Sequence, residues 1–508
     1  MDKKIVFSLL SNILIAFSAM FAIPIFYAVL FARDFEVAVF FAVIGICVFA
    51  AERILKQSGK GHRRHLPLLS AAISTLSAYP AVAIFACLPF IYFGNMTPID
   101  AILETISDLT SAGISILPQN SPYVLKLWQS VLMWFGSLIF LVMLVTVLPE
   151  VSGNFGMALS LHGGQNFSPI FGQMLVMAQR MINVYSVLTI FSVLIFKLAG
   201  LDFWDSILMA MRCISTGGGN FFPAQGNILV EYAAAFTMLL ACGNFLYYHR
   251  LIVTLPPPIT AQKTNIFRRG INYVKKFLQN ISANSKKFFT NSEVKAVILT
   301  VFVCVLLITF RLYLNGNLNG AENFRQTLFH VISFLSTTGI HFENFGQISD
   351  FDKFLMIMAT IFGGCIGSVT GGIKMIRAIV LAKIGAAELT KTIHPRMLTV
   401  IKVNRVSVPQ QIVGRILGFF FLSCITLFIC SAILSLTYLQ FSESVAMAFV
   451  CLTNLGTLPG VCEPENFLAL PPAGKIFCMA MLIIGRIEIF AILIVVAGLI
   501  SRRNIKEW

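Results

Sequence analysis

The sequence predicts an all-α polytopic membrane protein with two N-terminal helices and four helix–pore loop–helix repeats, about ten spanning helices in total. The first observation is composition: hydrophobic residues make up 57% of the chain, charged residues only 12%, and the mean hydropathy is +0.84. A soluble domain carries about 25% charged residues, so most of this chain is expected to lie in a bilayer. The second observation is a short polar motif that recurs four times between long apolar segments.

The recurring motif is a short Ser/Thr-rich stretch with glycine as its last residue. Its copies recur about every 110 residues, which indicates a repeated structural unit. The four copies are Thr110-Ser111-Ala112-Gly113, Ser215-Thr216-Gly217-Gly218, Ser336-Thr337-Thr338-Gly339 and Thr453-Asn454-Leu455-Gly456. A single loop of this kind is also typical of an extracellular turn, so the inference of a pore depends on the fourfold recurrence.

Each copy follows an apolar segment that is too short to cross the membrane. A helix needs about 20 residues to span a hydrocarbon core of roughly 30 Å. The four segments are Ile99–Leu109, Phe203–Ile214, Asn323–Leu335 and Ser442–Leu452. We therefore expect four re-entrant helices, each followed by one of the polar loops.

The composition of these loops suits a cation. Non-helical backbone at membrane depth is tolerated only where protein buries it or water lines it. Hydroxyl and carbonyl oxygens can replace the hydration shell of an ion, and glycine permits the backbone angles that aim carbonyls inward. All residues of the four copies are therefore predicted to bind the transported metal ion.

The remaining spans complete the expected order of the chain. The expected division is residues 1–65 for two N-terminal helices, 66–172 for pore repeat 1, 173–292 for repeat 2 and a basic cytoplasmic loop, 293–410 for repeat 3 with an intramembrane loop, and 411–508 for repeat 4. The N-terminal helices are expected near Ile5–Ala32 and Val37–Leu55, and the spans that flank the loops near Leu66–Phe93, Leu125–Leu148, Val184–Ala199, Leu229–Tyr248, Val294–Leu314, Phe351–Leu381, Ile416–Leu439 and Gly474–Ile500. The first of these is too long for a signal peptide and lacks a cleavage site, so it is expected to remain a helix.

The distribution of charge predicts the topology. Lys and Arg concentrate at both termini, after the second helix, and in two long connections, Lys263–Lys287 and Lys383–Arg415. The positive-inside rule places all of these in the cytoplasm. The outer segments lean acidic, and these acids would attract cations to an acidic pore mouth. These acids are Asp100, Glu104, Asp108, Asp202, Asp205, Glu343, Asp350, Glu443, Glu463 and Glu465.

A glycine-rich stretch interrupts the second helix of repeat 3. It runs from Gly363 to Lys374 and includes Gly363, Gly364, Gly367, Gly371 and Gly372. Each glycine costs a helix roughly 1 kcal/mol, so the stretch is expected to unwind. We interpret it as a gate below the filter, and close helix packing through small residues is the alternative.

Arg486 lies deep in the last apolar segment and is the other candidate gate residue. Arginine at mid-membrane costs about 2.5–3.5 kcal/mol and normally faces the interior of the bundle. Glu488 is two positions away and cannot share its helix face, so the two should have different partners. A positive charge below a cation filter would limit flux, and a structural ion pair between helices is the alternative.

Nothing in the sequence indicates an enzyme or an organic cofactor. The 11 cysteines include no CxxC pair, and the 7 histidines show no metal-ligand spacing. No Ser/His/Asp or Cys/His arrangement lies within the spans, which argues against an intramembrane hydrolase.

Together the loops, the Gly363–Gly372 stretch and Gly485-Arg486-Ile487-Glu488-Ile489-Phe490 resemble the Trk/Ktr/HKT superfamily of potassium transporters, and most closely its TrkH-type membrane subunits. The resemblance covers nearly the whole chain, and the two extra N-terminal helices favour the TrkH branch. It implies a pseudo-fourfold pore in a homodimer, in the inner (cytoplasmic) membrane. It also implies a cytoplasmic, nucleotide-binding regulatory ring of the TrkA or KtrA type as partner. By position, Gly113, Gly218, Gly339 and Gly456 correspond to the filter glycines of the superfamily.

The resemblance implies potassium uptake through a channel-like pore gated by that ring, with K⁺ as the transported ion. A proton- or sodium-coupled cation symporter is the alternative, because such transporters also use broken helices and repeats. It would need a titratable group at the midplane, for which Glu488 is the main candidate. Three departures from the superfamily pattern stand out: Gly219 replaces a large apolar residue, Thr457-Leu458-Pro459 lengthens the fourth loop, and Val369 is bulky for the gate.

Overall fold

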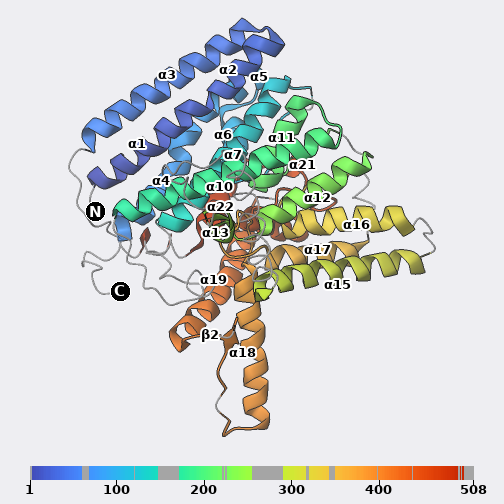
Figure 1. Cartoon of the computed structure of the whole chain (residues 1–508). Helices are drawn as coiled ribbons and strands as arrows, with labels where there is room; N and C mark the ends of the chain where they lie inside the picture. The colour runs from blue at the N-terminus through green and yellow to red at the C-terminus, as the bar shows by residue number, and fades with distance from the viewer. Residues whose placement is uncertain are drawn as a thin grey trace, which may run out of the picture.

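The structure is a computed structural model that describes residues 3–59, 68–118, 120–146, 171–219, 222–223, 226–253, 290–315, 320–342, 349–397, 399–404, 406–437, 439–489, 492 and 495–496. Within these residues the chain is helical, apart from loops and one two-stranded hairpin. Figure 1 shows the helices packed into one body, with one long helix projecting away from it. The basic loop Lys263–Lys287 falls outside the described residues.

The chain begins with a helical hairpin that has no loop of the pore type. Helices α1 (Lys3–Met20), α2 (Ala22–Tyr27) and η1 (Ala28–Ala32) form its first arm, and α3 (Phe35–Ser58) forms the second. Arg33 has φ 54° and ends the first arm. The Asp34 carboxylate accepts a hydrogen bond from the Val37 amide (3.3 Å), which caps the start of α3. This matches the two N-terminal helices that the sequence predicts.

The first two repeats follow the predicted order of span, short helix and span. Repeat 1 contains α4 (Leu68–Ala86), α5 (Leu88–Gly94), α6 (Pro98–Leu109) and α7 (Tyr123–Thr146), and repeat 2 contains α10 (Phe171–Leu198), α11 (Phe203–Ser215), α12 (Ile228–Cys242) and α13 (Phe245–Val253). The continuous helix expected over Leu229–Tyr248 is wrong. Gly243 has an extended backbone that ends α12, and α13 begins at Phe245.

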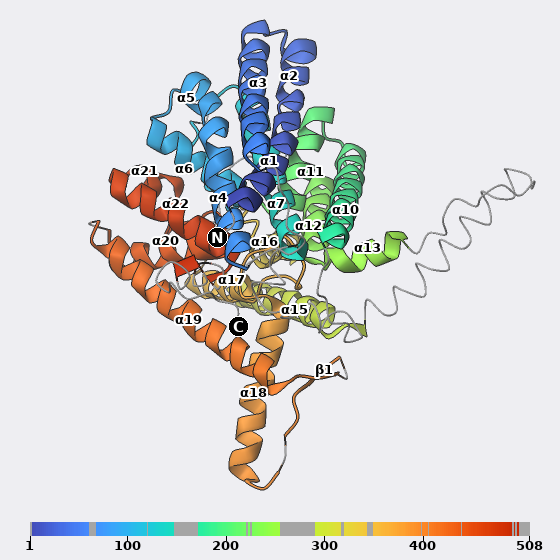
Figure 2. The ribbon, with the colours of Figure 1, turned by 90° about the vertical axis from the view of Figure 1, so that its left-hand side faces the viewer.

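The third and fourth repeats carry the projecting element. Repeat 3 contains α15 (Ser292–Leu314), α16 (Gly320–Leu335), α17 (Asp350–Phe362) and α18 (Met375–Ile393); a hairpin of β1 (Lys402–Val403) and β2 (Val406–Ser407) follows; repeat 4 contains α19 (Gln410–Ser435), α20 (Phe441–Thr453), α21 (Pro464–Leu468) and α22 (Pro472–Ile487). The strands are antiparallel and pair Lys402 with Ser407. Helix α18 and the hairpin extend beyond the helical body in both views (Figure 1, Figure 2).

Seven segments of the described residues are long and apolar enough to cross a membrane as single helices. The other three expected spans are the second helices of repeats 2, 3 and 4, and each is interrupted. The breaks lie at Gly243, at Gly363–Lys374 and at Glu488, which has φ 71° and ends α22 before the expected Ile500. Only the second of these breaks is predicted by the sequence.

Aromatic rings join the N-terminal hairpin to the first repeat. Trp128 of α7 is fully buried. Its ring centroid lies 4.8 Å from that of Phe21 and 5.3 Å from that of Phe41, and its indole N–H donates to the Ala86 carbonyl (3.0 Å). Phe17 contacts Phe135 on the same face of α7, with ring centroids 5.3 Å apart. The extra helices are therefore packed as part of the core.

Trp128→Ala should lower the free energy of unfolding by about 3–5 kcal/mol, because it removes a buried indole and leaves a cavity between the hairpin and α7. Thermal unfolding of the detergent-solubilised protein, followed by size-exclusion chromatography, measures the loss. Phe421→Ala is the matched control, since the Phe421 side chain is 68% exposed on α19. Equal melting temperatures for the two variants would contradict a packing role for Trp128.

Candidate ion pore

Each of the four loops follows the C-terminal end of a short helix, and the loops lie at the centre of the molecule. These helices are α6, α11, α16 and α20, and their last residues lie within one position of those the sequence predicts. Polar caps begin two of them. The Thr97 hydroxyl accepts from the Asp100 amide (3.3 Å) at α6, and Gln440 and Glu443 form a reciprocal capping box at α20. Each helix is largely buried.

The loops share one backbone turn. The second residue of every copy has a left-handed φ, between 52° and 57°, and these residues are Ser111, Thr216, Thr337 and Asn454. Non-glycine residues rarely adopt this conformation, and it persists only where the surroundings impose it. The same unusual turn at four equivalent positions shows that the repeat is one of structure as well as sequence.

The glycines of the four loops close a ring. A Cβ added at Gly113 would lie 2.6 Å from the Gly218 amide nitrogen, and one at Gly218 would lie 2.0 Å from the Thr338 carbonyl oxygen. A Cβ at Gly339 would lie 2.1 Å from the Leu455 carbonyl oxygen, and one at Gly456 would lie 2.7 Å from that of Ala112. Loop 1 therefore contacts loop 2, loop 2 contacts loop 3, loop 3 contacts loop 4, and loop 4 contacts loop 1. No side chain larger than hydrogen fits at these glycines.

The extra residues of the fourth loop stay outside this ring. Leu458 and Cys462 exchange two backbone hydrogen bonds of 2.9 and 2.7 Å. The Thr457-Leu458-Pro459 extension thereby folds back on itself as a tight turn. It lengthens the connection to α21, and the atoms nearest to a Cβ at Gly456 belong to loops 1 and 3.

The glycine-rich stretch of repeat 3 unwinds as predicted and forms a loop within the bundle. We call residues Gly363–Lys374 the gate loop. Its backbone pairs with the break in repeat 2: the Cys365 amide donates to the Cys242 carbonyl (2.9 Å), and the Phe245 amide donates to the Gly367 carbonyl (3.1 Å). On another side, the Ile366 amide donates to the Glu293 carboxylate of α15 (3.1 Å). Backbone groups at the two helix breaks, in repeats 2 and 3, therefore form hydrogen bonds with one another.

The gate loop also contacts the ring itself. The Gly371 amide donates to the Thr337 hydroxyl of loop 3 (2.8 Å). A Cβ added at Gly371 would lie 1.9 Å from the Thr453 carbonyl oxygen of loop 4. Glycine is required at position 371 because the backbone of the gate loop approaches the backbone of loop 4 too closely for a side chain. The gate loop therefore lies directly against loops 3 and 4.

Arg486 connects the gate loop to the other two loops. Its guanidinium donates to the Val369 carbonyl and to the Ser137 hydroxyl, both at 2.8 Å, and it lies over the Phe140 ring at 4.4 Å. Ser137 in turn donates to the Ser215 carbonyl of loop 2 (2.8 Å) and shares a 2.5 Å hydrogen bond with Ser111 of loop 1. Arg486 makes no ion pair among the described residues, which argues against the structural ion-pair alternative.

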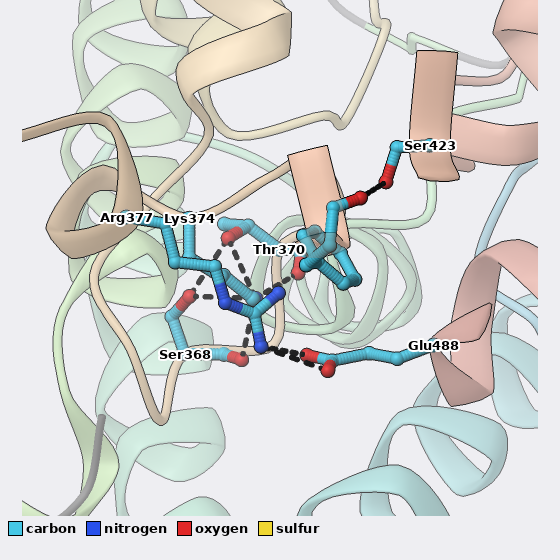
Figure 3. Close-up of polar contacts among 7 residues, drawn as sticks. Ser368, Thr370, Lys374, Arg377, Ser423 and Glu488 are labelled. Carbon is cyan, nitrogen blue, oxygen red and sulfur yellow. Dashed lines mark hydrogen bonds and ion pairs between the residues drawn. The ribbon is translucent and has the colours of Figure 1, made fainter. Parts of the chain in front are cut away.

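Lys374 holds the gate loop in a closed turn. Its side chain is buried, and its ammonium group donates to the Thr370 carbonyl and, at 3.3 Å, to the Ser368 carbonyl (Figure 3). The hydroxyls of Ser368 and Thr370 also bond one another (2.7 Å). Lysine supplies three donors and no acceptor, so it suits a turn lined with oxygens. Its φ is 78°, which is rare for a residue other than glycine, at the point where the loop ends and α18 begins.

Arg377, one turn further along α18, pairs with Glu488. Its guanidinium donates to the two carboxylate oxygens at 2.8 and 3.0 Å (Figure 3), and it lies 4.1 Å over the Phe419 ring of α19. Glu488 and Arg486 therefore have different partners, as predicted. Sequence reasoning did not single out Lys374 or Arg377 for a role, although a charged residue inside an apolar span is itself a signal.

The expectation of an acidic mouth is wrong for part of the acids. Glu104 and Asp108 are fully buried on the inner face of α6. The Glu104 carboxylate accepts from the Ile116 amide (2.7 Å) and from the Gln129 amide group. Asp100 lies in the first turn of α6 and forms an ion pair with Lys475 (2.6 Å). The hydrophobic spacing of α6 places Glu104 and Asp108 one turn apart on the same face, which was the available signal.

These elements define a multi-pass membrane protein whose four repeats meet in a ring. The family model for TrkH, described as a cation transport protein, matches residues 88–506. The chain therefore belongs to the TrkH family of cation transport proteins, and the family confirms the expectation of a transporter rather than an enzyme.

Several characterised relatives are similar over most of their length. The Trk system potassium uptake protein TrkH of Halomonas elongata is 24% identical over 501 residues, covering 97% of this chain and 98% of the relative. The Trk system potassium uptake protein TrkH of Escherichia coli is 26% identical over 415 residues, covering 80% of each. The crystal structure of the potassium transporter TrkH from Vibrio parahaemolyticus superposes with a TM-score of 0.80 at 22% identity, covering 99% of both chains, and confirms the predicted fold class.

Glu488→Gln should destabilise the protein by about 3–5 kcal/mol, because it leaves Arg377 buried without its partner charge. The exchanged pair Arg377→Glu with Glu488→Arg should recover part of that loss. Thermal unfolding of the single and double variants measures both effects. If the double variant melts no higher than Glu488→Gln, the contribution of the pair is not electrostatic.

Proposed function

We propose that this protein takes up potassium across the cytoplasmic membrane through the ring of four loops. The observation that carries the proposal is the closed contact of Gly113, Gly218, Gly339 and Gly456, one from each repeat. A ring of loops with hydroxyls and carbonyls can replace the hydration shell of a monovalent cation. The potassium uptake named for the relatives from Halomonas elongata and Escherichia coli supports this choice of ion.

In this account the sixteen residues of the four loops form the filter, and the ion then meets the gate loop and Arg486. The gate loop blocks the inner side of the ring through its contacts with Thr337 and Thr453. Arg486 adds a fixed positive charge that repels a passing cation. The short helices point their C-terminal ends, the negative ends of their dipoles, at the ring and favour a cation there.

Opening requires the gate loop to leave its present position. A continuous path runs to it from the cytoplasmic hairpin. The Asn404 side chain accepts from the Ser292 amide (2.8 Å) and donates to Asn291 (3.1 Å) at the start of α15. The next residue, Glu293, holds the Ile366 amide of the gate loop (3.1 Å). Movement of the hairpin would therefore be passed to the gate loop through α15.

The projecting α18 and hairpin suit a cytoplasmic regulatory partner. They carry the exposed basic residues Lys383, Lys391, Arg396 and Lys402. We propose that a nucleotide-binding ring of the TrkA or KtrA type binds a homodimer of this chain at these elements, with both termini in the cytoplasm. The Trk system named for the relatives supports a multi-component assembly.

The proposal is tested with the purified protein in liposomes, by radioactive rubidium uptake driven by a K⁺ gradient, with K⁺, Na⁺ or N-methylglucamine as competitor. Uptake that K⁺ suppresses far better than Na⁺, without a pH gradient, is expected. Uptake that appears only with a proton or sodium gradient would favour the coupled symporter instead. The structure leaves Glu488 poorly suited to that role, because its carboxylate is engaged by Arg377.

Gly339→Ser should lower the ratio of K⁺ to Na⁺ uptake by about tenfold, equivalent to about 1.4 kcal/mol of discrimination. The added side chain collides with the Leu455 carbonyl and forces loops 3 and 4 apart. Gly385→Ser is the matched control, because a Cβ there meets nothing within 4 Å. An unchanged ratio in a folded Gly339→Ser variant would remove this loop from the filter.

Arg486→Ala should raise the maximal rate of K⁺ uptake by roughly 30-fold, because a like charge about 8 Å from a passing ion contributes roughly 2 kcal/mol at an effective dielectric constant near 20. It also releases the Val369 carbonyl of the gate loop. Arg486→Lys, which retains the charge, should remain close to the original rate. A correctly folded Arg486→Ala variant with an unaltered or lower rate would indicate a purely structural residue.

A further inference from the structure

The second loop of the ring differs from the other three in its backbone. In loops 1, 3 and 4 the last glycine of the motif has a left-handed φ: 71° at Gly113, 73° at Gly339 and 97° at Gly456. In loop 2 the left-handed glycine is the next residue, Gly219, with φ 77°, and Gly218 is not left-handed. The backbone conformation that orients the Gly218 carbonyl therefore differs from the conformation at Gly113, Gly339 and Gly456.

The four repeats also differ in the residue that lies six positions before the motif glycine. We call this position the support position. Its occupants are Ser107, Arg212, Ser333 and Val450. In every repeat the backbone carbonyl at this position accepts from the amide just before the motif glycine, at 2.9 to 3.2 Å. The support position thus fixes each loop to its own short helix.

The side chains at the support position act on the loops in different ways. In loop 1 the Ser107 hydroxyl accepts from the Ile114 amide (2.7 Å), and in loop 3 the Ser333 hydroxyl donates to the Ile340 carbonyl (2.7 Å). Both bonds hold the residue after the glycine. In loop 2 the Arg212 guanidinium instead donates to the Gly218 carbonyl itself (3.2 Å). In loop 3 the equivalent Gly339 carbonyl accepts from the His341 ring (2.9 Å), and among the described residues only loop 2 has an arginine or lysine bound to a carbonyl of the ring.

Arg212 is held rigidly enough to position that carbonyl. Its side chain is 1% exposed. Its Nε donates to the Ser130 hydroxyl (2.8 Å) and another nitrogen donates to the Gln129 carbonyl oxygen (3.1 Å). The carboxylates of Glu104 and Asp108 on α6 interact electrostatically with it. A buried guanidinium with opposite charges nearby stays ionised and in place.

Gly219 has no side chain and leaves room for the Arg212 guanidinium. A Cβ added there would lie 2.7 Å from a terminal nitrogen of Arg212, and φ 77° disfavours any other residue. The absence of a large apolar side chain at this position is therefore what admits the guanidinium to the ring.

We propose that Arg212 is a positioning residue that sets the ion specificity of loop 2 by holding the Gly218 carbonyl. The inference rests on the proposed conduction of potassium. The guanidinium occupies one lone pair of the carbonyl and prevents the oxygen from moving inward. Because Na⁺ is smaller than K⁺ and needs shorter oxygen distances, a carbonyl that cannot move inward penalises Na⁺ more than K⁺.

The test compares variants by the ratio of K⁺ to Na⁺ uptake in liposomes, with melting temperature recorded for each. Arg212→Gln removes the charge, and the double variant Arg212→Gln with Asp108→Asn removes one compensating carboxylate as well, so that the site stays closer to neutral. Gly219→Ala leaves every charge in place and pushes on the guanidinium. Each should lower the ratio by about tenfold, because loss of one charged hydrogen bond shifts an equilibrium by about this factor or more.

Arg325→Gln is the matched control. Arg325 is a mostly buried arginine of α16 that pairs with Glu231 of α12 (2.9 Å) between repeats 2 and 3, and no hydrogen bond from it to a ring carbonyl is present in the described structure. It should lower the melting temperature and leave the ratio unchanged.

Two results would overturn the inference. Unchanged ratios in folded Gly219→Ala and in the double variant would show that Arg212 only stabilises the fold, and an equal loss in Arg325→Gln would show that any buried charge has the same effect. A failure of the proposed function is distinguishable, because the unaltered protein would then conduct without preferring K⁺.

Discussion

The structure depends on one constraint: backbone groups that leave a helix inside a bilayer must find partners within the protein. Four loops and a gate loop all break helical pairing near the centre of this chain. Each pore loop returns an amide to the carbonyl of its support position. The gate loop pairs with the repeat 2 break at Cys242 and Phe245, and with the Glu293 carboxylate. The irregular segments are therefore stable because they are assembled against one another.

These shared hydrogen bonds connect the ring of four loops to the gate loop. Ser137 bonds loop 1 and loop 2, and Arg486 joins Ser137 to the Val369 carbonyl of the gate loop. On the opposite side, Thr337 of loop 3 accepts from Gly371 of the same gate loop. Displacing the gate loop breaks the hydrogen bonds that its Val369 carbonyl and Gly371 amide make with Arg486 and Thr337. In an opened state these groups need new hydrogen-bond partners. Ions, water or a rearranged α18 can supply them.

Most of the fold could be predicted because its signals are local. Apolar length indicated the spans, and the recurring glycine motif located the four short helices to within one residue at their C-terminal ends. Glycine density predicted the break in repeat 3, whereas the breaks at Gly243 and Glu488 depend on a single residue each and gave no comparable signal. The pairing of Arg377 with Glu488, which are 111 positions apart, depends on how repeats 3 and 4 meet. The burial of Glu104 and Asp108 likewise depends on how α7 packs against α6, where Gln129 donates to the Glu104 carboxylate.

The most direct test of the central account is a crystal structure of the protein grown in rubidium or thallium, with anomalous scattering used to locate the ion. The account predicts density on the axis of the ring, within coordinating distance of carbonyls from all four loops. The same map should show no ion beyond the gate loop while that loop remains in its present position. A clear ion site elsewhere in the bundle, with none inside the ring, would contradict the account.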